Sequence, residues 1–453
     1  MKVYDWFNIS FDIFGRTTKS PHEEITHDIF LKLYQNGYMQ ERMTTQLYCS
    51  GHRTILADRY VVGECPDCGY ADAHGEQCDV CSRLVVQPVT LKNPRCKLDG
   101  CRPTTKKTKH IFVELDKLES EVNEFYEQSS RKGKWPTVSK SITEAWLNEG
   151  LQPRSITRDI KWGSKIPLRD YENKVIYPWF DAPIGYISIT AQYTDQWKKW
   201  WQNPDEVELH QFIGKYNVLF HSILFPATLM GTGDNWTKVY RLNATDFLTY
   251  EGGKFSKFCG VGVFGDLAEK TGVPSDVWRF FLLSSRPETG DTEFTWDSFI
   301  SSNNITLVGN LGRFVNSVLF LFNLPPYNGI VPDSTYYSDI YLETCQREVN
   351  KHLALFVQDI EFVKLRDGLA KALHISQLGN NLLKQHEKTA SRESAAVISL
   401  AVNLVHLVAS FIALFLPETA SSINTQLCAG PLLIPDRWTA DSIQAGHKIG
   451  ETR

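Results

Sequence analysis

The chain has little excess of charge of either sign. Its 48 Lys and Arg residues against 52 Asp and Glu residues leave a formal net charge of −4. This balance excludes an overall basic field, so a nucleic acid would have to bind a local patch such as Lys106, Lys107 and Lys109. A lysine run of this kind is also typical of a solvated loop. Internal repeats and low-complexity segments are lacking as well.

The sequence also lacks the signature of a targeting segment. Its start, MKVYDWFNISFDIFGRT, has no basic stretch followed by a continuous apolar run, so we expect a cytosolic, reducing compartment. The most apolar window, residues 395–416, is interrupted by Ser399, Asn403, His406 and Ser410 and has no basic flank. This favours a buried bundle helix over a membrane span.

Disulfides are not expected in that compartment, so the ten cysteines need another role. Cys65 with Cys68 and Cys78 with Cys81 form two CxxC pairs. Four thiolates at this spacing can close a tetrahedron around Zn²⁺ with no position left open. The pattern therefore predicts a structural zinc site.

The other cysteines have no such spacing. Cys96 and Cys101 are spaced CxxxxC, wider than a zinc knuckle requires, and we expect surface thiols there rather than a second zinc site. The cysteines without a partner nearby in sequence are expected to be packed or inert; they are Cys49, Cys259, Cys345 and Cys428.

Hydrophobic periodicity divides the chain into an α/β part and a helical part. Ser20 as cap, Pro21 at the first position and Glu23 closing a capping box predict a helix that ends at Gly37. Its apolar stripe comprises Ile25, Ile29, Phe30, Leu33 and Tyr34. Helices over 115–125 and 141–148 and strands over 175–180, 209–213 and 239–242 predict an α/β sheet. Helical periodicity from 297 to 416 predicts a helical domain.

Two motifs point to a binding site. Trp179 to Tyr186 (WFDAPIGY) places large aromatics and an acid where a pocket wall at a sheet edge would lie, although aromatic runs are usually core. Lys254 and Lys257 follow two glycines on one loop, which suits neutralisation of a leaving pyrophosphate, although a solvated loop is the alternative.

The order of these motifs resembles one family. CxxC pairs, WFDAPIGYISIT, HQFIGKYNVLFHSILFPA, EGGKFSKFCGVGVFGD and a helical domain together resemble the class I methionyl-tRNA synthetases of eukaryotic, cytosolic type. The similarity runs from WFNISFDIFGRTT to AGHKIG. It implies an α/β fold: a partial Rossmann-type catalytic domain with an inserted zinc-knuckle connective module, followed by an all-α anticodon-binding-type helical domain.

The resemblance also implies domain boundaries. They are 1–45 for a remnant of the catalytic domain with a helix over 20–37, 46–155 for the connective insertion, 156–250 for the second half of the Rossmann domain, 251–296 for the KMSKS-type loop and stem-contact region, 297–435 for the helical domain and 436–453 for a tail.

The family's activity is ATP-dependent activation of methionine, with Mg²⁺, and its transfer to tRNA. By resemblance, the methionine pocket consists of Trp179, Ala182, Pro183, Tyr186 and His221. The catalytic loop consists of Lys254, Ser256 and Lys257, of which Lys254 and Lys257 contact ATP. A zinc ion held by Cys65, Cys68, Cys78 and Cys81 is the implied structural metal.

Several positions depart from the family pattern. The family's HxGH motif is absent, because no two of the 12 histidines are three residues apart. Tyr216 stands where the family has Asp, and Phe258 and Cys259 stand where it has Ser and Arg. Arg313 and Ser317 stand at its anticodon readers.

We therefore expect that these 453 residues lack the first half of the catalytic domain and are inactive alone. The alternatives left open are a methionine–tRNA ligase whose upstream half lies outside this sequence, a non-catalytic paralogue that binds a protein or tRNA with weak or no anticodon specificity, and a decaying copy.

Overall fold

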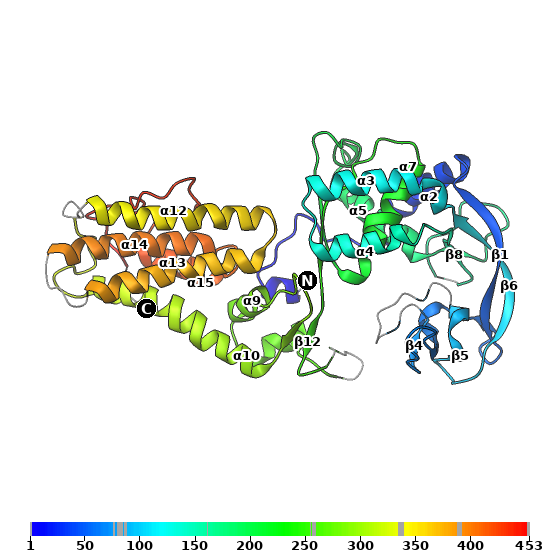
Figure 1. Ribbon diagram of the computed structural model, residues 1–453, viewed down its shortest axis with the longest axis horizontal. Coiled ribbons are helices and arrows are strands. Elements are labelled where there is room, and N and C mark those ends of the chain that lie inside the picture. Colours follow the sequence, from blue (N-terminus) through cyan, green and yellow to red (C-terminus); the bar gives the residue numbers. More distant parts are fainter. Residues whose placement is uncertain are drawn as a thin grey trace. The chain divides into compact units, whose positions relative to one another are not determined.

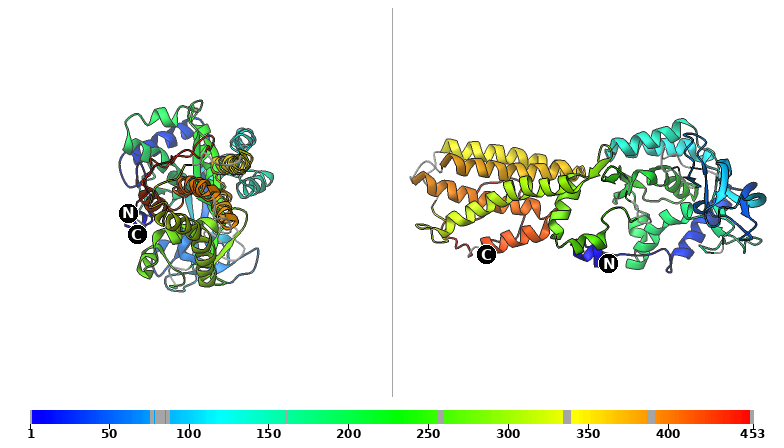
Figure 2. Two further views of the ribbon diagram at one scale, coloured as in Figure 1. Left: turned by 90° about the vertical axis from the view of Figure 1, so that its left-hand side faces the viewer. Right: turned by 90° about the horizontal axis from the view of Figure 1, so that it is seen from below.

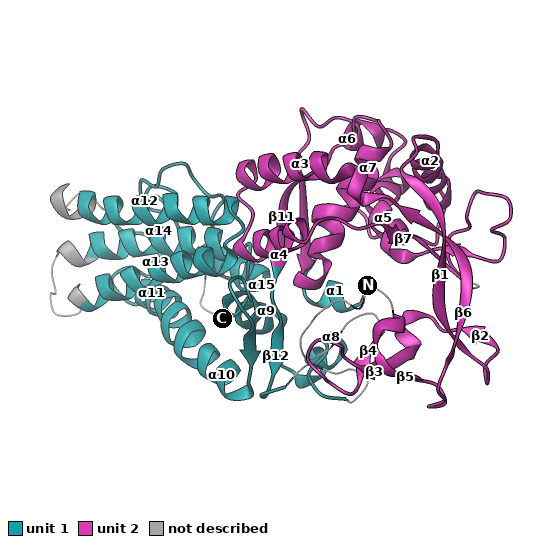
Figure 3. Cartoon of the chain, turned by 45° about the vertical axis from the view of Figure 1, so that its right-hand side comes forward, with its two compact units in different colours: residues 1–11, 245–453 teal, residues 12–244 magenta. Residues whose placement is uncertain are grey.

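The chain forms two compact units in this computed structural model (Figure 3). One unit joins Met1–Phe11 to Thr245–Arg453, and the other comprises Asp12–Ala244. The structure describes residues 2–75, 78, 85, 88–160, 162–253, 255, 260–333, 339–386 and 392–450, without the side chains of 339–342, 385–386 and 392–394. Both units combine helices with short strands, so the prediction of a mixed α/β chain with a helical C-terminal region is confirmed.

A long antiparallel ribbon organises the unit of residues 12–244 (Figure 1). Strand β1 (Met39–Cys49) pairs with β6 (Thr104–Val113), from Met39 opposite Val113 to Tyr48 opposite Thr104. Strands β2 (Thr54–Ile55) and β7 (Arg154–Ser155) extend it into a sheet of order β2-β1-β6-β7. The ribbon is buried at its Val113 end and exposed at its Thr104 end, so it leads from the core of this unit outward.

A small cysteine-rich module lies at the far end of this ribbon. Its sheet has the order β4-β3-β5 and comprises β3 (Val61–Glu64), β4 (Ala73–His74) and β5 (Lys92–Cys96), with short helical turns η1 (Asp58–Tyr60) and η2 (Pro88–Thr90). Gly75 lies so close to this turn that a Cβ atom there would meet the Asp58 carbonyl oxygen at 2.3 Å. Only glycine therefore fits the backbone approach that closes the module.

The rest of this unit is built mainly from helices around one apolar core. Its elements are α2 (His22–Gln35), η3 (Leu115–Leu118), α3 (Glu119–Lys132), α4 (Thr137–Asn148), β8 (Thr157–Arg158), β9 (Val175–Ile176), α5 (Pro178–Tyr193), α6 (Lys198–Trp201), β10 (Leu209–Gly214), η4 (Lys215–Asn217), η5 (Phe220–Leu224), α7 (Phe225–Gly231) and β11 (Val239–Thr245). Helices α2, α5 and α7 contact one another through buried side chains such as Ile29, Leu33 and Ile184. The core therefore lies under α5, the helix that carries the aromatic motif.

Two local predictions are wrong. The capping box is not formed, because α2 begins at His22 without a side-chain cap and Glu23 instead accepts a hydrogen bond from the Lys165 amide at 3.2 Å. The strand expected over 175–180 ends at Ile176, and α5 begins at Pro178. Proline is favoured at the first position of a helix, and this preference outweighs the strand propensity of the aromatic residues.

The other unit begins with an aromatic core around a parallel pair of strands. Its elements are α1 (Lys2–Trp6), β12 (Leu248–Tyr250), α8 (Gly265–Ala268), η6 (Glu269–Thr271), α9 (Ser275–Ser284), β13 (Thr292–Phe294) and α10 (Trp296–Ser301). The rings of Trp278 and Phe294 stack with centroids 5.8 Å apart, and Phe299 packs 4.5 Å from Trp278. These buried rings attach α9 and α10 to the strands.

A helical bundle completes this unit. It consists of η7 (Ser302–Gly312), α11 (Arg313–Asn323), α12 (Asp339–Glu361), α13 (Leu365–His386), α14 (Arg392–Ile412) and α15 (Pro417–Leu427). Helices α12, α13 and α14 lie side by side in every view of the chain (Figures 1 and 2). Phe356 stacks on Phe411 at 4.0 Å and joins α12 to α14.

Among the described residues, two helical stretches are long and apolar enough to cross a membrane, Trp296–Asn323 and Ala395–Ile412. Core helices share this length and composition. The window in Ala395–Ile412 is 94% buried inside the structure, against 33% for the window in Trp296–Asn323. The expected bundle helix over 395–416 agrees with this burial.

Candidate functional site

Helix α5 presents the aromatic motif as one stripe. Trp179, Ala182, Pro183 and Tyr186 are three or four residues apart, a spacing that aligns side chains on one helical face. Trp179 is half-buried, Pro183 is buried, and Ala182 and Tyr186 are exposed. The stripe thus runs from the core of the unit to its surface.

His221 comes to this stripe from a separate element. It lies on η5, a wider π-helical turn of a kind that often occurs at functional sites. Its Nε2 lies 2.9 Å from the hydroxyl of Tyr186, and its Nδ1 lies 2.8 Å from the carbonyl oxygen of Asn217. A carbonyl only accepts, so Nδ1 carries the proton and Nε2 accepts a hydrogen bond from Tyr186.

Burial keeps this pair uncharged. Desolvation lowers the pKa of His221, and this outweighs the opposite effect of the Asn217 carbonyl. Desolvation also raises the pKa of Tyr186. Around neutral pH the pair is therefore a neutral imidazole and a neutral phenol.

Trp179 belongs to the same aromatic surface. Its ring centroid lies 4.9 Å from that of Phe220, the neighbour of His221, and 5.1 Å from that of Tyr177. The structure therefore brings Trp179, Tyr186 and His221 together from α5 and η5. Such a surface is neutral, aromatic and partly open, which suits an apolar, polarisable side chain.

Tyr177 connects this surface to the cysteine module. Its hydroxyl donates to Asp58 at 2.9 Å, Arg158 donates to the same carboxylate at 3.3 Å, and the Arg158 guanidinium lies 3.8 Å from the Tyr177 ring centroid. Asp58 lies on η1, beside the sheet of the module. The sequence did not single out this cluster, because its members lie far apart along the chain.

The predicted lysine loop, Lys254, Ser256 and Lys257, lies outside the described residues, as do Phe258 and Cys259. Its base is described. Phe255 packs 5.2 Å from Tyr250, and the Glu251 carboxylate accepts a hydrogen bond from the Trp296 amide at 2.9 Å. Glu251 and Phe255 thus contact the aromatic core beside β12.

Three of the four predicted zinc ligands are close together. One ligand atom each of Cys65, Cys68 and Cys78 lies within 4.8 Å of the others, and the Cys68 and Cys78 sulfurs are 3.5 Å apart. Cys81 lies outside the described residues. Tetrahedral Zn–S bonds of about 2.3 Å place two sulfurs about 3.8 Å apart, so the three described thiols fit this geometry.

A second cluster corrects the sequence prediction. Cys49, expected to be packed or inert, is buried, and its sulfur lies 3.1 Å from His52 Nδ1 and 3.2 Å from the Cys101 sulfur. Ligand atoms of Cys49, His52, Cys96 and Asp99 all lie within 4.8 Å of one another. The prediction that Cys96 and Cys101 are surface thiols is also wrong for Cys96, which is buried. Cys49-x-x-His52 pairs a thiol with an imidazole, so it lies outside the CxxC pattern.

The pKa shifts within this second cluster have opposite directions: that of Cys49 is lowered, whereas desolvation raises the pKa of Cys96 and hydrogen bonding to Cys49 raises the pKa of Cys101 to about 12. Hydrogen bonding from the His52 backbone lowers the pKa of the Cys49 thiol to about 7. Hydrogen bonding by Cys101 lowers the pKa of Asp99 to about 2. A thiolate and a carboxylate beside an imidazole are ordinary ligands of Zn²⁺.

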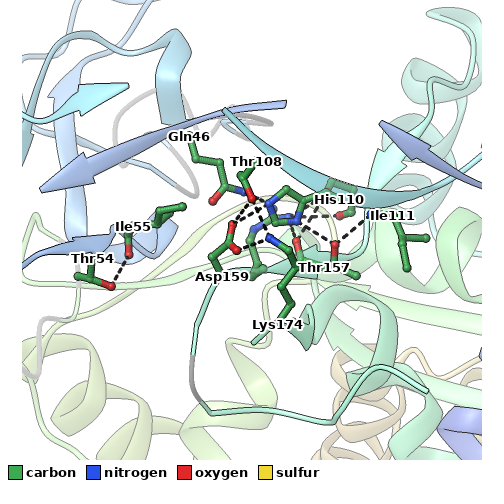
Figure 4. Close-up of polar contacts among 11 residues, drawn as sticks. Gln46, Thr54, Ile55, Thr108, His110, Ile111, Thr157, Asp159 and Lys174 are labelled. Carbon is green, nitrogen blue, oxygen red and sulfur yellow. Dashed lines mark hydrogen bonds and ion pairs between the residues drawn. The ribbon is translucent and has the colours of Figure 1, made fainter. Parts of the chain in front are cut away.

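A buried polar network at the base of the ribbon also escaped sequence reasoning (Figure 4). His110 is fully buried; its Nε2 lies 2.9 Å from Asp159 and its Nδ1 lies 2.8 Å from the Thr157 hydroxyl. Lys174 forms an ion pair with Asp159 and donates to Thr108 at 2.7 Å. The network joins β6 to the segments around β8 and β9, and its burial indicates a structural role.

Known proteins are similar to this chain over most of its length. The family described as tRNA synthetases class I (M) matches residues 1–319. The probable cytoplasmic methionine–tRNA ligase of Schizosaccharomyces pombe is 48% identical over 99% of this chain and 58% of its own length. The cytoplasmic methionine–tRNA ligases of Saccharomyces cerevisiae and Homo sapiens are 46% and 43% identical, with 60% and 50% of their lengths covered. The chain thus spans between half and three-fifths of these relatives.

A solved structure shares the fold. Mycobacterium tuberculosis methionyl-tRNA synthetase bound by methionyl-adenylate matches with a TM-score of 0.75 over 100% of this chain and 84% of that chain, at 19% identity. The free form of the same bacterial enzyme matches with a TM-score of 0.74.

Proposed function

The chain belongs to the class I methionyl-tRNA synthetase family, and on that premise we propose that its aromatic surface of Trp179, Tyr186 and His221 binds methionine for ATP-dependent activation. The observation that carries the proposal is the hydrogen bond of 2.9 Å between Tyr186 and His221. It holds two rings edge to face, with centroids 5.6 Å apart, beside Trp179. A thioether gains from contact with such aromatic rings.

The reaction proposed for the family fold needs no side-chain nucleophile. The methionine carboxylate attacks the α-phosphorus of ATP, the bond to the bridging oxygen breaks, and pyrophosphate leaves. A hydroxyl at the 3′ end of tRNA then attacks the acyl carbon, the bond from that carbon to the phosphate oxygen breaks, and AMP leaves. Lys254, Ser256 and Lys257 are proposed to neutralise charge on the leaving pyrophosphate, with Mg²⁺ carried by ATP. We propose a cytosolic location, by analogy with the cytoplasmic ligases of yeasts and human.

Three substitutions are proposed to slow this chemistry. Tyr216 lies on η4, next to Asn217, the hydrogen-bond partner of His221, and it places a neutral ring where the family has an acid. Phe258 and Cys259 remove a hydroxyl and a cation from the lysine loop. The removal of one preorganised donor typically costs about 10²- to 10³-fold in rate, so binding and chemistry separate.

These substitutions also favour a second candidate function, a non-catalytic module that binds methionine, tRNA or a protein. Arg313, at the start of α11, and Ser317 replace the family's anticodon readers, so any tRNA binding is proposed to depend little on the anticodon. The two candidates differ in one measurement, which is methionine-dependent exchange of pyrophosphate into ATP.

The test combines calorimetry with this exchange assay on the 453-residue chain. We expect L-methionine to bind more tightly than L-leucine, which lacks the sulfur. Failure to bind methionine would refute the assignment of the aromatic surface. Binding without exchange above that of a Lys257→Ala control supports the non-catalytic module, whereas exchange that depends on Lys257 supports the ligase.

Two structural zinc sites are proposed for the connective module. The first uses the three clustered thiols of Cys65, Cys68 and Cys78 together with Cys81. The second uses Cys49, His52 and Cys96 with either Asp99 or Cys101. When bound, zinc at the second site would crosslink β1 to β5, and zinc at the first would close the turn that follows β3; Cys49, Cys65, Cys78 and Cys96 themselves belong to the buried cluster of the module.

A further inference from the structure

An apolar pocket of about 650 Å³ lies within the unit that contains the helical bundle. Helices α1 and α9, the start of α13 and the turn before α15 form its walls. Six of its apolar lining residues are Val3, Phe7, Leu282, Leu283, Leu365 and Phe415. Pockets of this size and composition are typical of sites for small organic ligands.

One cation stands in this apolar lining. Arg279 of α9 borders the pocket and donates three hydrogen bonds to backbone carbonyls, at 2.6 Å to Phe415, 2.9 Å to Phe7 and 3.2 Å to Leu414. A guanidinium carries five N–H donors, so two remain without a partner among the described residues. Partial burial lowers the pKa of Arg279, because desolvation outweighs the charge of Asp276.

One oxygen of each nearby carboxylate accepts a hydrogen bond from another group, and the buried Oδ1 of Asp276 has no hydrogen-bond partner among the described residues. Asp276, one turn before Arg279, accepts a hydrogen bond from the Thr419 amide at 2.7 Å, and Glu418 accepts one from Asn8 at 2.8 Å. Within the described part of the chain, neither forms an ion pair with Arg279. The guanidinium is thus held rigidly by carbonyls while its charge lacks a direct counterion.

The rim of the pocket is apolar and open to solvent. Tyr4 and Ile9 are each 38% exposed, and Leu414 is 50% exposed. An occupant therefore has to supply two things at once, a carboxylate for Arg279 and apolar surface for the walls.

We infer that this pocket binds an amphipathic monocarboxylate, with the alkyl chain between α1 and α9 and the carboxylate on the two unused N–H groups of Arg279. A planar guanidinium matches a carboxylate with two parallel hydrogen bonds. The inference is independent of the methionine site, because every lining residue belongs to the unit of residues 1–11 and 245–453.

The test uses decanoate as the probe, below its micelle concentration, with decanol as its neutral analogue. Calorimetry on the 453-residue chain is expected to give about tenfold tighter binding for decanoate, since a charged hydrogen-bonded pair adds to the shared alkyl contacts. Equal binding of the two probes, or binding of neither, would overturn the inference.

Two rim variants and one distant control sharpen the experiment. Leu414→Glu places a carboxylate beside Arg279 and is expected to weaken decanoate binding about tenfold, whereas Leu414→Gln, of the same length but neutral, weakens it no more than about threefold. Leu433→Glu, at an exposed position away from the pocket lining, leaves binding unchanged. Equal losses in the Glu and Gln variants at Leu414 would contradict a role for charge.

Arg279→Gln should abolish the preference for decanoate over decanol. Thermal unfolding of this variant checks that the lost backbone hydrogen bonds have not unfolded the chain. If it has unfolded, the Leu414 pair still decides the inference. Sedimentation of the free chain tests the other occupant, because a dimer that Leu414→Glu dissociates would show that a second copy fills the pocket.

Discussion

The hydroxyl of Tyr186 donates a hydrogen bond of 2.9 Å to Nε2 of His221, although 35 residues separate them. The other imidazole nitrogen donates to the Asn217 carbonyl, so the two bonds together satisfy both ring nitrogens and fix one tautomer. The pair therefore presents a defined neutral surface, and substitution of Tyr186 removes the hydroxyl that donates to His221.

Tyr186→Phe should weaken methionine binding about three- to tenfold. The variant keeps the ring but leaves the buried Nε2 of His221 without its donor, so the imidazole can reorient. Calorimetry with L-methionine measures the effect. Tyr193→Phe on the same helix, at a position 58% exposed, is the matched control and should bind as the unmodified chain does. Equal affinities in the two variants would show that the bond does not shape the site.

Reversion of the three departures should separate chemistry from binding. In a fusion that supplies the first catalytic half from a cytoplasmic methionine–tRNA ligase, Tyr216→Asp, Phe258→Ser and Cys259→Arg together are expected to raise the rate of pyrophosphate exchange about 10²-fold or more. Methionine affinity should change little, because the reverted groups act on charge in the transition state. The same triple variant with Lys257→Ala is the control. A change in affinity as large as the change in rate would contradict this separation.

The zinc content of the chain should show that both cysteine clusters bind metal. We expect two zinc equivalents per chain, one after Cys68→Ser with Cys78→Ser, and one after His52→Ala with Cys96→Ser, as each pair dismantles one cluster. Native mass spectrometry counts the ions. Cys428→Ser, an exposed thiol outside both clusters, should leave two. A single equivalent in the unmodified chain, unchanged after His52→Ala with Cys96→Ser, would contradict the second site.

The network around His110 predicts a pH-dependent stability. Burial lowers the pKa of His110 in the folded chain. At pH values below 6.5, the ordinary pKa of histidine, the unfolded chain therefore binds more protons than the folded chain, and the free energy of unfolding decreases as the pH is lowered. His110→Gln should cost about 1–3 kcal/mol at pH 7.5, and the difference from the unmodified chain should shrink as pH falls from 6.5 to 5. Denaturant unfolding across this range measures it; a difference that stays constant refutes the role of His110 titration.

Asp58→Asn should loosen the connection between the cysteine module and the aromatic surface. It removes the carboxylate shared by Tyr177 and Arg158, at a cost of about 1–3 kcal/mol, and it should also weaken methionine binding because Tyr177 supports the ring of Trp179. Asp72→Asn, whose exposed carboxylate pairs with Arg95 on the same module, is the control. Stability lost without a change in methionine affinity would limit Asp58 to a structural role.

Local patterns made part of this structure predictable. The apolar stripe of α2 repeats at helical spacing, and Ile25, Ile29, Phe30 and Leu33 are all buried as expected, whereas Tyr34 at its edge is 38% exposed. Gly37 follows the helix with φ +79°, the conformation that favours glycine there. The Cys65–Cys68 pair is equally local, because one short turn brings its thiols together.

Long-range contacts were not predictable from pattern alone. Cys49 lies close to Cys96 because β1 and β5 end at the same place, and the spacing of these two cysteines in the sequence does not predict this proximity. His221 entered the candidate site through family resemblance, since its approach to Tyr186 depends on packing of η5 against α5. The start of α5 was misjudged because Pro178 decides it, not the aromatic residues that follow.

The register of the β1–β6 ribbon gives these separate features a common dependence. Arg42 lies opposite His110 and Tyr48 opposite Thr104, so a slip by one residue would turn every side chain of one strand to the other face. A slip of β6 would move His110 away from Asp159, and a slip of β1 would move Cys49 away from Cys96. Zinc loading at the outer end and burial of His110 at the inner end can therefore occur together in one pairing, so metal uptake in a refolding experiment serves as a reporter of strand alignment in the interior.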